Sequence, residues 1–135
     1  MEILTIETNQ ERESIDLTDK INEIISRNAA QGEMCHLFVR HTTAALTTVY
    51  IDPKKEMDLI GMMEAVMPHA IHAPKGEKTH THLTTYLPPD ILASFVGATL
   101  AIPVKDGKLM LGNFQRVVLL EFSGPGKREI VIVED

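Results

Sequence analysis

The sequence predicts one α+β domain built around a largely antiparallel pair of β-sheets. Its 135 residues, 44% of them apolar, can bury one hydrophobic core but are too few for two domains of ordinary size, so we expect residues 1–135 to form a single unit. Helical and extended patterns alternate in the first part of the chain, and the last third reads as a succession of strands. That order is typical of an α+β fold.

The first expected elements are a strand and an amphipathic helix. Residues 2–8 alternate apolar and polar side chains, as a half-buried strand does. Ser14 and Asp16 then mark the expected start of a helix that ends near Asn28. Its apolar residues recur at helical spacing, at Leu17, Ile21, Ile24 and Ile25.

Six further strands are expected from segments that are rich in β-branched residues or extended in pattern. A short turn at residues 42–45 joins the segments 35–40 and 46–51. The Asp106-Gly107 dipeptide favours a tight hairpin between the segments 99–104 and 108–111. The last four are expected to form a meander. The segments are 35–40, 46–51, 99–104, 108–111, 116–122 and 129–133.

Two more helices are expected between these strands. Asp52 can accept hydrogen bonds from a first helical turn and Pro53 suits the first helical position, so a helix is predicted to run from there to residue 67, before Pro68. A shorter helix starts at the Pro88-Pro89 pair, continues through residue 95 and ends before Gly97.

The composition argues against nucleic acid and membrane partners. The formal net charge is −6 and no basic cluster is longer than two residues, whereas both partners attract clustered cations. No apolar stretch approaches the roughly 20 residues that span a bilayer, and the N-terminus lacks the pattern of a secretion signal. We therefore expect a soluble cytoplasmic protein, in which the single cysteine, Cys35, is a small buried side chain.

Four of the six histidines lie in one polar segment: His69, His72, His80 and His82. In an extended chain His80 and His82 point to the same side, so their imidazoles can share one metal ion if a third ligand comes from elsewhere. The alternative is a polar surface loop that simply tolerates histidine. His69 and His72 are the weaker candidates.

His41 follows a predicted strand and, by the two-residue period, lies on the side of that strand's apolar residues. A lone histidine in that position is usually a core residue with a satisfied hydrogen bond. The alternative is a functional role, because the hydroxyl and backbone N–H groups of Thr42 and Thr43 can hold an anion.

Carboxylates and amides add candidates. Asp52 precedes one predicted helix and Asp90 lies at the start of the other, where a carboxylate stabilises the helix end, but either can also be a proton acceptor or a metal ligand. In the turn at residues 112–115, Asn113 and Gln115 can donate hydrogen bonds to an anion, or the turn only connects adjacent strands. The chain has neither a Gly-x-Ser-x-Gly elbow nor a Gly-rich nucleotide-binding motif.

Several motifs resemble those of the YjbQ-like family. His-Thr-Thr-Ala-Ala-Leu-Thr at residues 41–47 follows a strand, as the family's hallmark does. Asp52-Pro53 followed by Asp58, and a glycine-rich block that starts at Gly97, agree with the family in order and spacing. Gly-Asn-Phe-Gln at residues 112–115 resembles the family's Gly-Thr/Asn-Trp-Gln turn. Together these motifs cover nearly the whole chain.

The resemblance implies two packed, mostly antiparallel sheets with two main helices in the order β2-α-β2-α-β3, assembled as a homotrimer with sites near the subunit boundaries. It also implies a secondary thiamine-phosphate synthase, a transferase that joins a pyrimidine diphosphate to a thiazole phosphate and releases pyrophosphate. The expected partner is thus a phosphorylated small molecule, and the expected cofactor is a divalent metal, zinc or magnesium.

On this resemblance, His41 is expected to transfer a proton or bind the ligand, with Asp52 as a second catalytic residue. His80 and His82 are expected to bind the metal or the diphosphate. The expected substrate-binding residues are Thr42, Thr43, Gly97, Asn113 and Gln115.

The sequence departs from the family pattern in three places. The family tryptophan is Phe114, and Arg116 stands where a small residue is usual. A family histidine that directly precedes the short helix matches His82 only if residues 84–90 are an insertion; without a gap, that position falls on Asp90. We prefer His82, because this alignment keeps the pair of imidazoles together.

Two rival hypotheses follow. The first is a non-catalytic trimeric module that binds a metal or a phosphorylated metabolite, and the displaced histidine favours it slightly. The second is a metal-dependent hydrolase, which needs a carboxylate beside the histidines that Asp52 or Asp90 can supply.

Overall fold

The computed structural model describes residues 1–28, 32–52 and 88–135. The helix predicted after Asp52 and the four clustered histidines lie outside these ranges. In chain order the described elements are β1 (Glu2–Thr8), β2 (Glu13–Asp16), α1 (Thr18–Arg27), β3 (Met34–Val39), β4 (Ala44–Tyr50), α3 (Pro89–Val96), β5 (Thr99–Lys105), β6 (Lys108–Leu109), β7 (Gln115–Glu121) and β8 (Gly126–Glu134).

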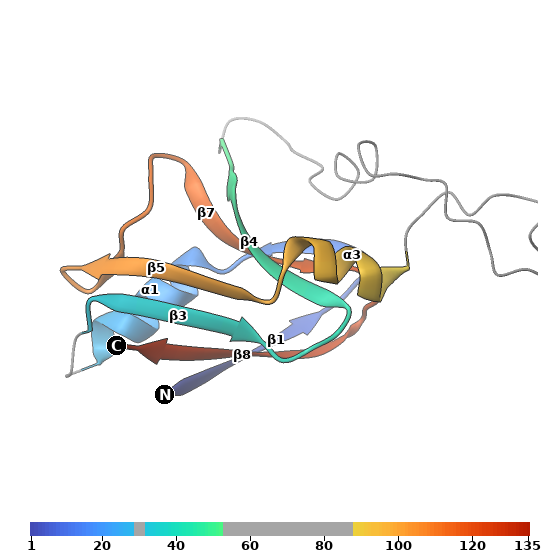
Figure 1. Cartoon of the computed structure of the whole chain (residues 1–135), viewed down its shortest axis with the longest axis horizontal. Coiled ribbons are helices and arrows are strands. Elements are labelled where there is room, and N and C mark those ends of the chain that lie inside the picture. Colours follow the sequence, from blue (N-terminus) through green and yellow to red (C-terminus); the bar gives the residue numbers. More distant parts are fainter. Residues whose placement is uncertain (29–31, 53–87) are drawn as a thin grey trace, which may run out of the picture.

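The strands form two antiparallel sheets that pack against each other (Figure 1). The larger sheet has the order β1-β8-β3-β5-β6, and the smaller has the order β2-β7-β4. The predicted α+β class with two mostly antiparallel sheets is therefore confirmed, and the described ranges contain two helices. Neither of these helices is long and apolar enough to cross a membrane.

The smaller sheet is a middle layer with apolar side chains on both faces. On one face, Leu46 and Leu119 join a core that is shared with the larger sheet and α1. On the other face, Val118 and Leu120 pack with Leu92 of α3. Burial of a leucine side chain stabilises a fold by about 1.5–3 kcal/mol, and α3 depends on such packing because isolated helices shorter than about 12 residues are marginal in water.

The predicted start of the first helix is wrong by a few residues. The segment at Ser14 and Asp16 forms β2, which pairs with β7, and the helix starts at Thr18. The exposed edge of β7 provides this segment with backbone partners, so sheet pairing takes residues that local capping signals assign to a helix. The Asp16 carboxylate still serves the helix end, because its Oδ1 accepts a hydrogen bond from the Thr18 N–H at 3.0 Å.

The expected connections between strands are also partly wrong. The chain between β3 and β4 does not make a hairpin within one sheet; it crosses from the larger sheet to the smaller one, and β4 begins two residues earlier than predicted, at Ala44. The last four strands do not form a meander, because β7 enters the smaller sheet and β8 lies between β1 and β3. β7 has apolar side chains on both faces, so it needs a position that is covered on both faces, which the centre of the smaller sheet provides.

Two local predictions are confirmed. The short helix α3 begins at Pro89 and ends before Gly97, as its proline pair and glycine predict. The dipeptide Asp106-Gly107 joins β5 to β6 with positive φ angles of 54° and 74°, which a two-residue type I′ hairpin requires.

Among the described residues, one ion pair lies inside the protein, where β7 ends and β8 begins. The Glu121 side chain is completely buried and that of Arg128 almost so, and Arg128 Nε donates to Glu121 Oε1 at 2.6 Å. Arg40 and Glu129 form a second pair at 2.9 Å, but both of those side chains are largely exposed. The two pairs have the same chemistry in different surroundings, so comparing them isolates the effect of burial.

We predict that Glu121→Ala lowers the free energy of unfolding by about 3–5 kcal/mol, because it leaves the Arg128 charge buried without a partner. Glu129→Ala removes the acid of the exposed pair and is expected to cost about 0–1 kcal/mol. Urea unfolding of both variants and the wild type measures the difference. Equal losses in the two variants would contradict the structural account of the buried pair.

Candidate functional site

His41 lies in the segment that crosses between the two sheets. The segment is fixed at both ends: the Arg40 N–H donates to the Glu129 carbonyl at 2.9 Å, and the Phe122 N–H donates to the Thr43 carbonyl at 3.0 Å. Of the two alternatives for His41, the core residue is wrong, because its side chain is exposed. Since β3 ends at Val39, the two-residue period of the strand no longer determines where His41 points.

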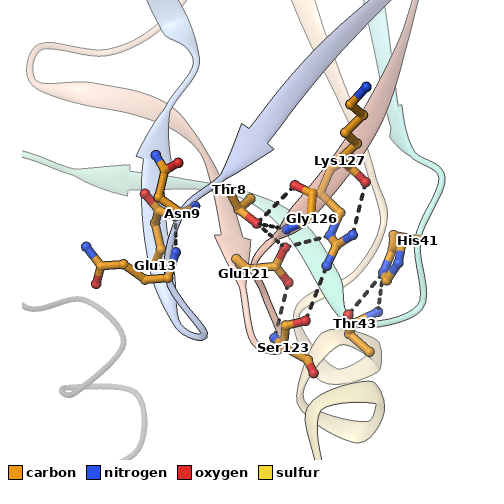
Figure 2. Close-up of polar contacts among 11 residues, drawn as sticks. Thr8, Asn9, Glu13, His41, Thr43, Glu121, Ser123, Gly126 and Lys127 are labelled. Carbon is orange, nitrogen blue, oxygen red and sulfur yellow. Dashed lines mark hydrogen bonds and ion pairs between the residues drawn. The ribbon is translucent and has the colours of Figure 1, made fainter.

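The His41 ring is held through its Nδ1 atom. The Thr43 backbone N–H donates to Nδ1 at 3.1 Å, and the Thr43 hydroxyl oxygen lies 3.0 Å from the same nitrogen (Figure 2). A nitrogen that accepts from an amide carries no proton, so the neutral ring has its proton on Nε2. His41 therefore presents an N–H donor, and Thr43 is occupied in orienting the ring instead of being free for a ligand.

The surroundings also favour the neutral ring. Partial burial lowers the pKa of His41 below its ordinary value of 6.5, and the positive charge of Arg128 lowers it further, while the negative charge of Glu121 opposes the shift. The Thr43 N–H acts in the same direction, because a protonated Nδ1 cannot accept its hydrogen bond. At neutral pH the imidazole is consequently uncharged.

His41 lines an open cleft of about 320 Å³ between the crossing segment and α3, which we name the His41 cleft. Thr42 and Gly97, two of the residues expected to bind substrate, line it, and α3 contributes Asp90 and Ser94. Gly97 has a φ of 109°, which favours glycine, and its carbonyl accepts from the Leu46 N–H at 3.0 Å. The glycine thereby joins this wall of the cleft to β4.

The groups in the His41 cleft have complementary hydrogen-bonding roles. The His41 Nε2–H and the Thr42 hydroxyl are donors, whereas the Asp90 carboxylate is an acceptor. The Ser94 hydroxyl already donates to the Ile91 carbonyl at 2.8 Å, so it is not aimed at a ligand. The cleft is suited to a ligand that needs a neutral donor on one side and a carboxylate on the other.

Asn113 and Gln115 lie elsewhere. They line a second cleft, of about 650 Å³, together with Asp16 and Arg116, which we name the Asn113 cleft. Gln115 Oε1 accepts from the Gly112 N–H at 2.8 Å, and Gln115 Nε2 donates to Thr48 Oγ1 at 3.2 Å. The Gln115 amide thus organises its own turn, and the exposed Asn113 is the amide left to face a ligand.

Asp52 is also far from His41. It follows β4 at the strand end opposite His41, where the Tyr50 hydroxyl donates to Asp52 Oδ2 at 3.4 Å and the Tyr50 ring meets the Phe114 ring edge-on. A seven-residue strand such as β4 spans roughly 20 Å, so the structure does not bring Asp52 and His41 together within one chain. The residues predicted to share one site are divided between the two ends of β4.

The predicted metal ligands, His80 and His82, lie outside the described residues. Within residues 1–28, 32–52 and 88–135, no three His, Cys, Asp or Glu side chains gather in a group that could hold a metal ion. Cys35 is fully buried, as predicted, and burial raises the pKa of its thiol to about 11, so it is not a reactive nucleophile.

Sequence reasoning gave too little weight to Asp90 and did not identify Glu121 and Arg128. Asp90 and Ser94 are four residues apart on a helix, a spacing that places them on one face, and this signal was available in the sequence. The burial of Glu121 and Arg128 had no local signal, because it depends on how β7 and β8 separate into different sheets.

Relatives of this chain match it over nearly its whole length. A family model described as "UPF0047 protein YjbQ-like" matches residues 2–133. A UPF0047 protein of Methanocaldococcus jannaschii is 32% identical over 128 residues, which cover 94% of this chain and 88% of that protein. A UPF0047 protein of Archaeoglobus fulgidus is 30% identical over 129 residues, which cover 96% of each chain.

Solved structures have a similar fold. A conserved protein of the yjbq/upf0047 family from Clostridium acetobutylicum superposes with a TM-score of 0.76 at 25% identity, and the match covers 100% of both chains. A conserved hypothetical protein from Thermus thermophilus gives a TM-score of 0.75 at 27% identity, again over 100% of both chains. The likeness thus extends over the entire domain.

We predict that neutral His41 is the Nε2–H tautomer and that it is half-protonated below pH 6.5, because burial, the Arg128 charge and the Thr43 N–H all oppose protonation. Two-dimensional ¹H–¹⁵N NMR of the histidine rings over a pH titration measures both properties. Thr43→Val is the control, because it removes the hydroxyl but keeps the backbone N–H, so the tautomer should be unchanged. An Nδ1–H tautomer, or a midpoint above 6.5, would show that the ring is not held in this way.

Proposed function

Because this chain belongs to the YjbQ-like UPF0047 family, we propose that it is a thiamine-phosphate-synthase-like transferase that works at the His41 cleft. Its substrates would be a pyrimidine diphosphate and a thiazole phosphate, and its products thiamine phosphate and pyrophosphate. The observation that supports this proposal is the state of His41, whose Nδ1 accepts from Thr43, so that its neutral ring keeps the donor N–H on Nε2, and whose side chain lines a cleft of ligand size.

The reaction needs stabilisation of negative charge more than it needs a base. The ring nitrogen of the thiazole forms a bond to the methylene carbon of the pyrimidine, while the bond from that carbon to the diphosphate oxygen breaks. The electron pair leaves with pyrophosphate, so charge develops on the departing oxygen. A preorganised donor at that oxygen lowers the barrier, which is the role that we assign to His41 Nε2–H, assisted by the Thr42 hydroxyl.

A homotrimer is part of this proposal. In the larger sheet, residues that pair across adjacent strands form one row over four strands: Ile3, Val131, Phe38 and Thr99. Val133 lies on the same outer face, two residues along β8 from Val131. Phe38 remains 45% exposed and Ile3 47% exposed. An apolar row of this kind is typical of a surface that is covered by another subunit.

Assembly would also account for the divided site. In a closed ring each subunit presents one surface to a different surface of its neighbour. The His41 cleft of one subunit and the Asn113 cleft of the next would then form a complete site, with Asn113 and Asp52 contributed by the neighbour. The separation of the two clefts within one chain is what supports a site at the subunit boundary.

A divalent metal, zinc or magnesium, bound by His80 and His82 is also proposed, and it would neutralise the charge of the diphosphate. The described residues do not assemble a metal site by themselves. The role of His41 derived above does not depend on the metal.

The second candidate is a non-catalytic module that binds a phosphorylated metabolite. It is favoured by the separation of Asp52 from His41, because only one of the two residues predicted to be catalytic lines the His41 cleft. Both candidates bind a phosphorylated ligand, but only the transferase forms a product. Pyrophosphate binding without product formation would therefore favour the non-catalytic module.

We predict that His41→Ala lowers the rate of thiamine phosphate formation by about 10²–10³-fold, the usual effect of losing a transition-state donor. His41→Gln is expected to lose less, because its amide N–H can replace Nε2–H as a donor but cannot transfer a proton. Product formation is measured by chromatography with purified protein. Rates in His41→Ala equal to the wild type would exclude the proposed role, and equal losses in both variants would indicate proton transfer instead of donation.

We predict that Phe38→Glu converts the trimer into monomers, because it introduces a charge into the apolar row of the larger sheet. Size-exclusion chromatography with light scattering measures the mass. Ser26→Glu is the control, since it places the same charge on an exposed part of α1 that lines neither cleft. A wild-type monomer would refute the proposed trimer, and dissociation of Ser26→Glu alone would place the interface on another face.

A further inference from the structure

We propose that the buried pair of Glu121 and Arg128 positions His41: it fixes the turn that carries the imidazole and sets the balance of charge beneath it. The inference deepens the function proposed above, because it concerns the same cleft. Neither residue lines that cleft, so both act through His41 and not on a substrate.

The pair is surrounded by satisfied hydrogen bonds (Figure 2). Glu121 Oε1 accepts from Arg128 Nε at 2.6 Å and from the Thr8 hydroxyl at 3.1 Å, and Oε2 accepts from the Ser123 N–H at 3.2 Å. The remaining Arg128 nitrogens donate to the carbonyls of Lys127 and Ser123 at 3.0 and 3.3 Å. These hydrogen bonds hold both side chains in one geometry.

The close approach of the backbone at Gly126 belongs to the same arrangement. A Cβ atom added to Gly126 would lie 2.6 Å from an Arg128 guanidinium nitrogen, and the Gly126 N–H donates to the Thr8 hydroxyl at 2.9 Å. The start of β8 is thus shaped around the arginine side chain.

Stability alone does not explain a buried ion pair. Desolvation of two charges is expensive, and well-packed apolar residues of similar volume are often as stable or more stable. This pair has 0% and 6% exposure for Glu121 and Arg128, so the full desolvation cost applies. Its position beside the His41 turn offers a reason for keeping the charges.

The backbone links the pair to both ends of that turn. Glu121 is the register partner of Ala44, the first residue of β4, and the next residue, Phe122, donates its N–H to the Thr43 carbonyl. On the other side, the residue after Arg128 accepts the Arg40 N–H. A shift of either member of the pair therefore moves the segment that orients the His41 ring.

The charges of the pair act on His41 in opposite directions. Arg128 favours the neutral ring, and Glu121 favours the protonated ring. Among the described residues, the other charged groups near the turn are Asp90, across the cleft on α3, the exposed pair of Arg40 and Glu129, and the exposed Lys127. That pair is solvated and contains one charge of each sign, so its net effect on the ring is small.

The test is an NMR pH titration of the His41 ring without substrate, with the resonance assigned by its loss in His41→Gln. Arg128→Met is expected to raise the midpoint of the titration, and Glu121→Gln is expected to lower it further. Arg128→Lys keeps the charge and should remain near the wild type. Lys127→Met removes an equal charge from the exposed residue that precedes Arg128, and it should change the midpoint little.

Opposite shifts in the two charge variants confirm that the two charges of the pair act on the His41 ring, because loosening of the turn alone would move the midpoint upward towards 6.5 in both cases. Upward shifts in both, or no shift in either, would overturn it. Glu121→Gln decides the question alone if Arg128→Met does not fold. Since no turnover is measured, opposite shifts in a protein without synthase activity would reject the proposed function and leave the positioning pair intact.

Discussion

The smaller sheet is buried on both faces, and the rest of the molecule is arranged around this constraint. Alternate side chains of β7 enter two different cores, so one face needs the larger sheet with α1, and the other needs α3. The chain can supply both covers only if it leaves the larger sheet after β3 and returns to it after α3. The segment that makes the first crossing carries His41, and the helix that covers the second face carries Asp90. The His41 cleft is thus a consequence of how the middle layer is covered.

The same constraint explains why charges are found inside the protein. Glu121 ends a strand whose two faces are both occupied, so its carboxylate has no route to solvent and needs a partner. Arg128 supplies it from the first residues of β8, across the connection from one sheet to the other. In energetic terms the pair tolerates burial because Glu121 accepts three hydrogen bonds and each guanidinium nitrogen of Arg128 donates one. In structural terms the pair connects the two sheets next to the segment that crosses from β3 to β4.

The sequence predicted those features that depend on neighbours in the chain. The Pro88-Pro89 start of α3, its end before Gly97 and the Asp106-Gly107 hairpin are set by φ restrictions and local hydrogen bonds, and all three agree with the structure. Features that depend on sheet pairing were not predictable in this way. Ser14 and Asp16 have the composition of a helix start, but the edge of β7 recruits them into β2.

The candidate site shows the same division between local and non-local information. The motif at residues 41–43 identified His41, yet its side chain is exposed and not in the core, because the strand period ends where the chain changes sheets. Asp52 was expected beside His41, but β4 places the two residues at opposite ends of a strand. Thr43 was expected to bind a ligand, whereas its N–H and hydroxyl are directed at the imidazole. A residue type defines the chemistry of a side chain, and the packing of the fold determines which group that side chain contacts.

The orientation of the His41 ring restricts the chemistry of the cleft more than the presence of a histidine does. With Nδ1 accepting from an amide, the neutral ring has no free lone pair, so it can neither bind a metal ion nor accept a proton without losing that hydrogen bond. What it can do is donate from Nε2, and a positioned neutral donor is effective where negative charge appears during the reaction. Departure of pyrophosphate creates such a charge, whereas activation of a water for hydrolysis would call for a base, which in this cleft is Asp90. The choice between transfer and hydrolysis therefore rests on which of these two side chains contacts the reacting atoms.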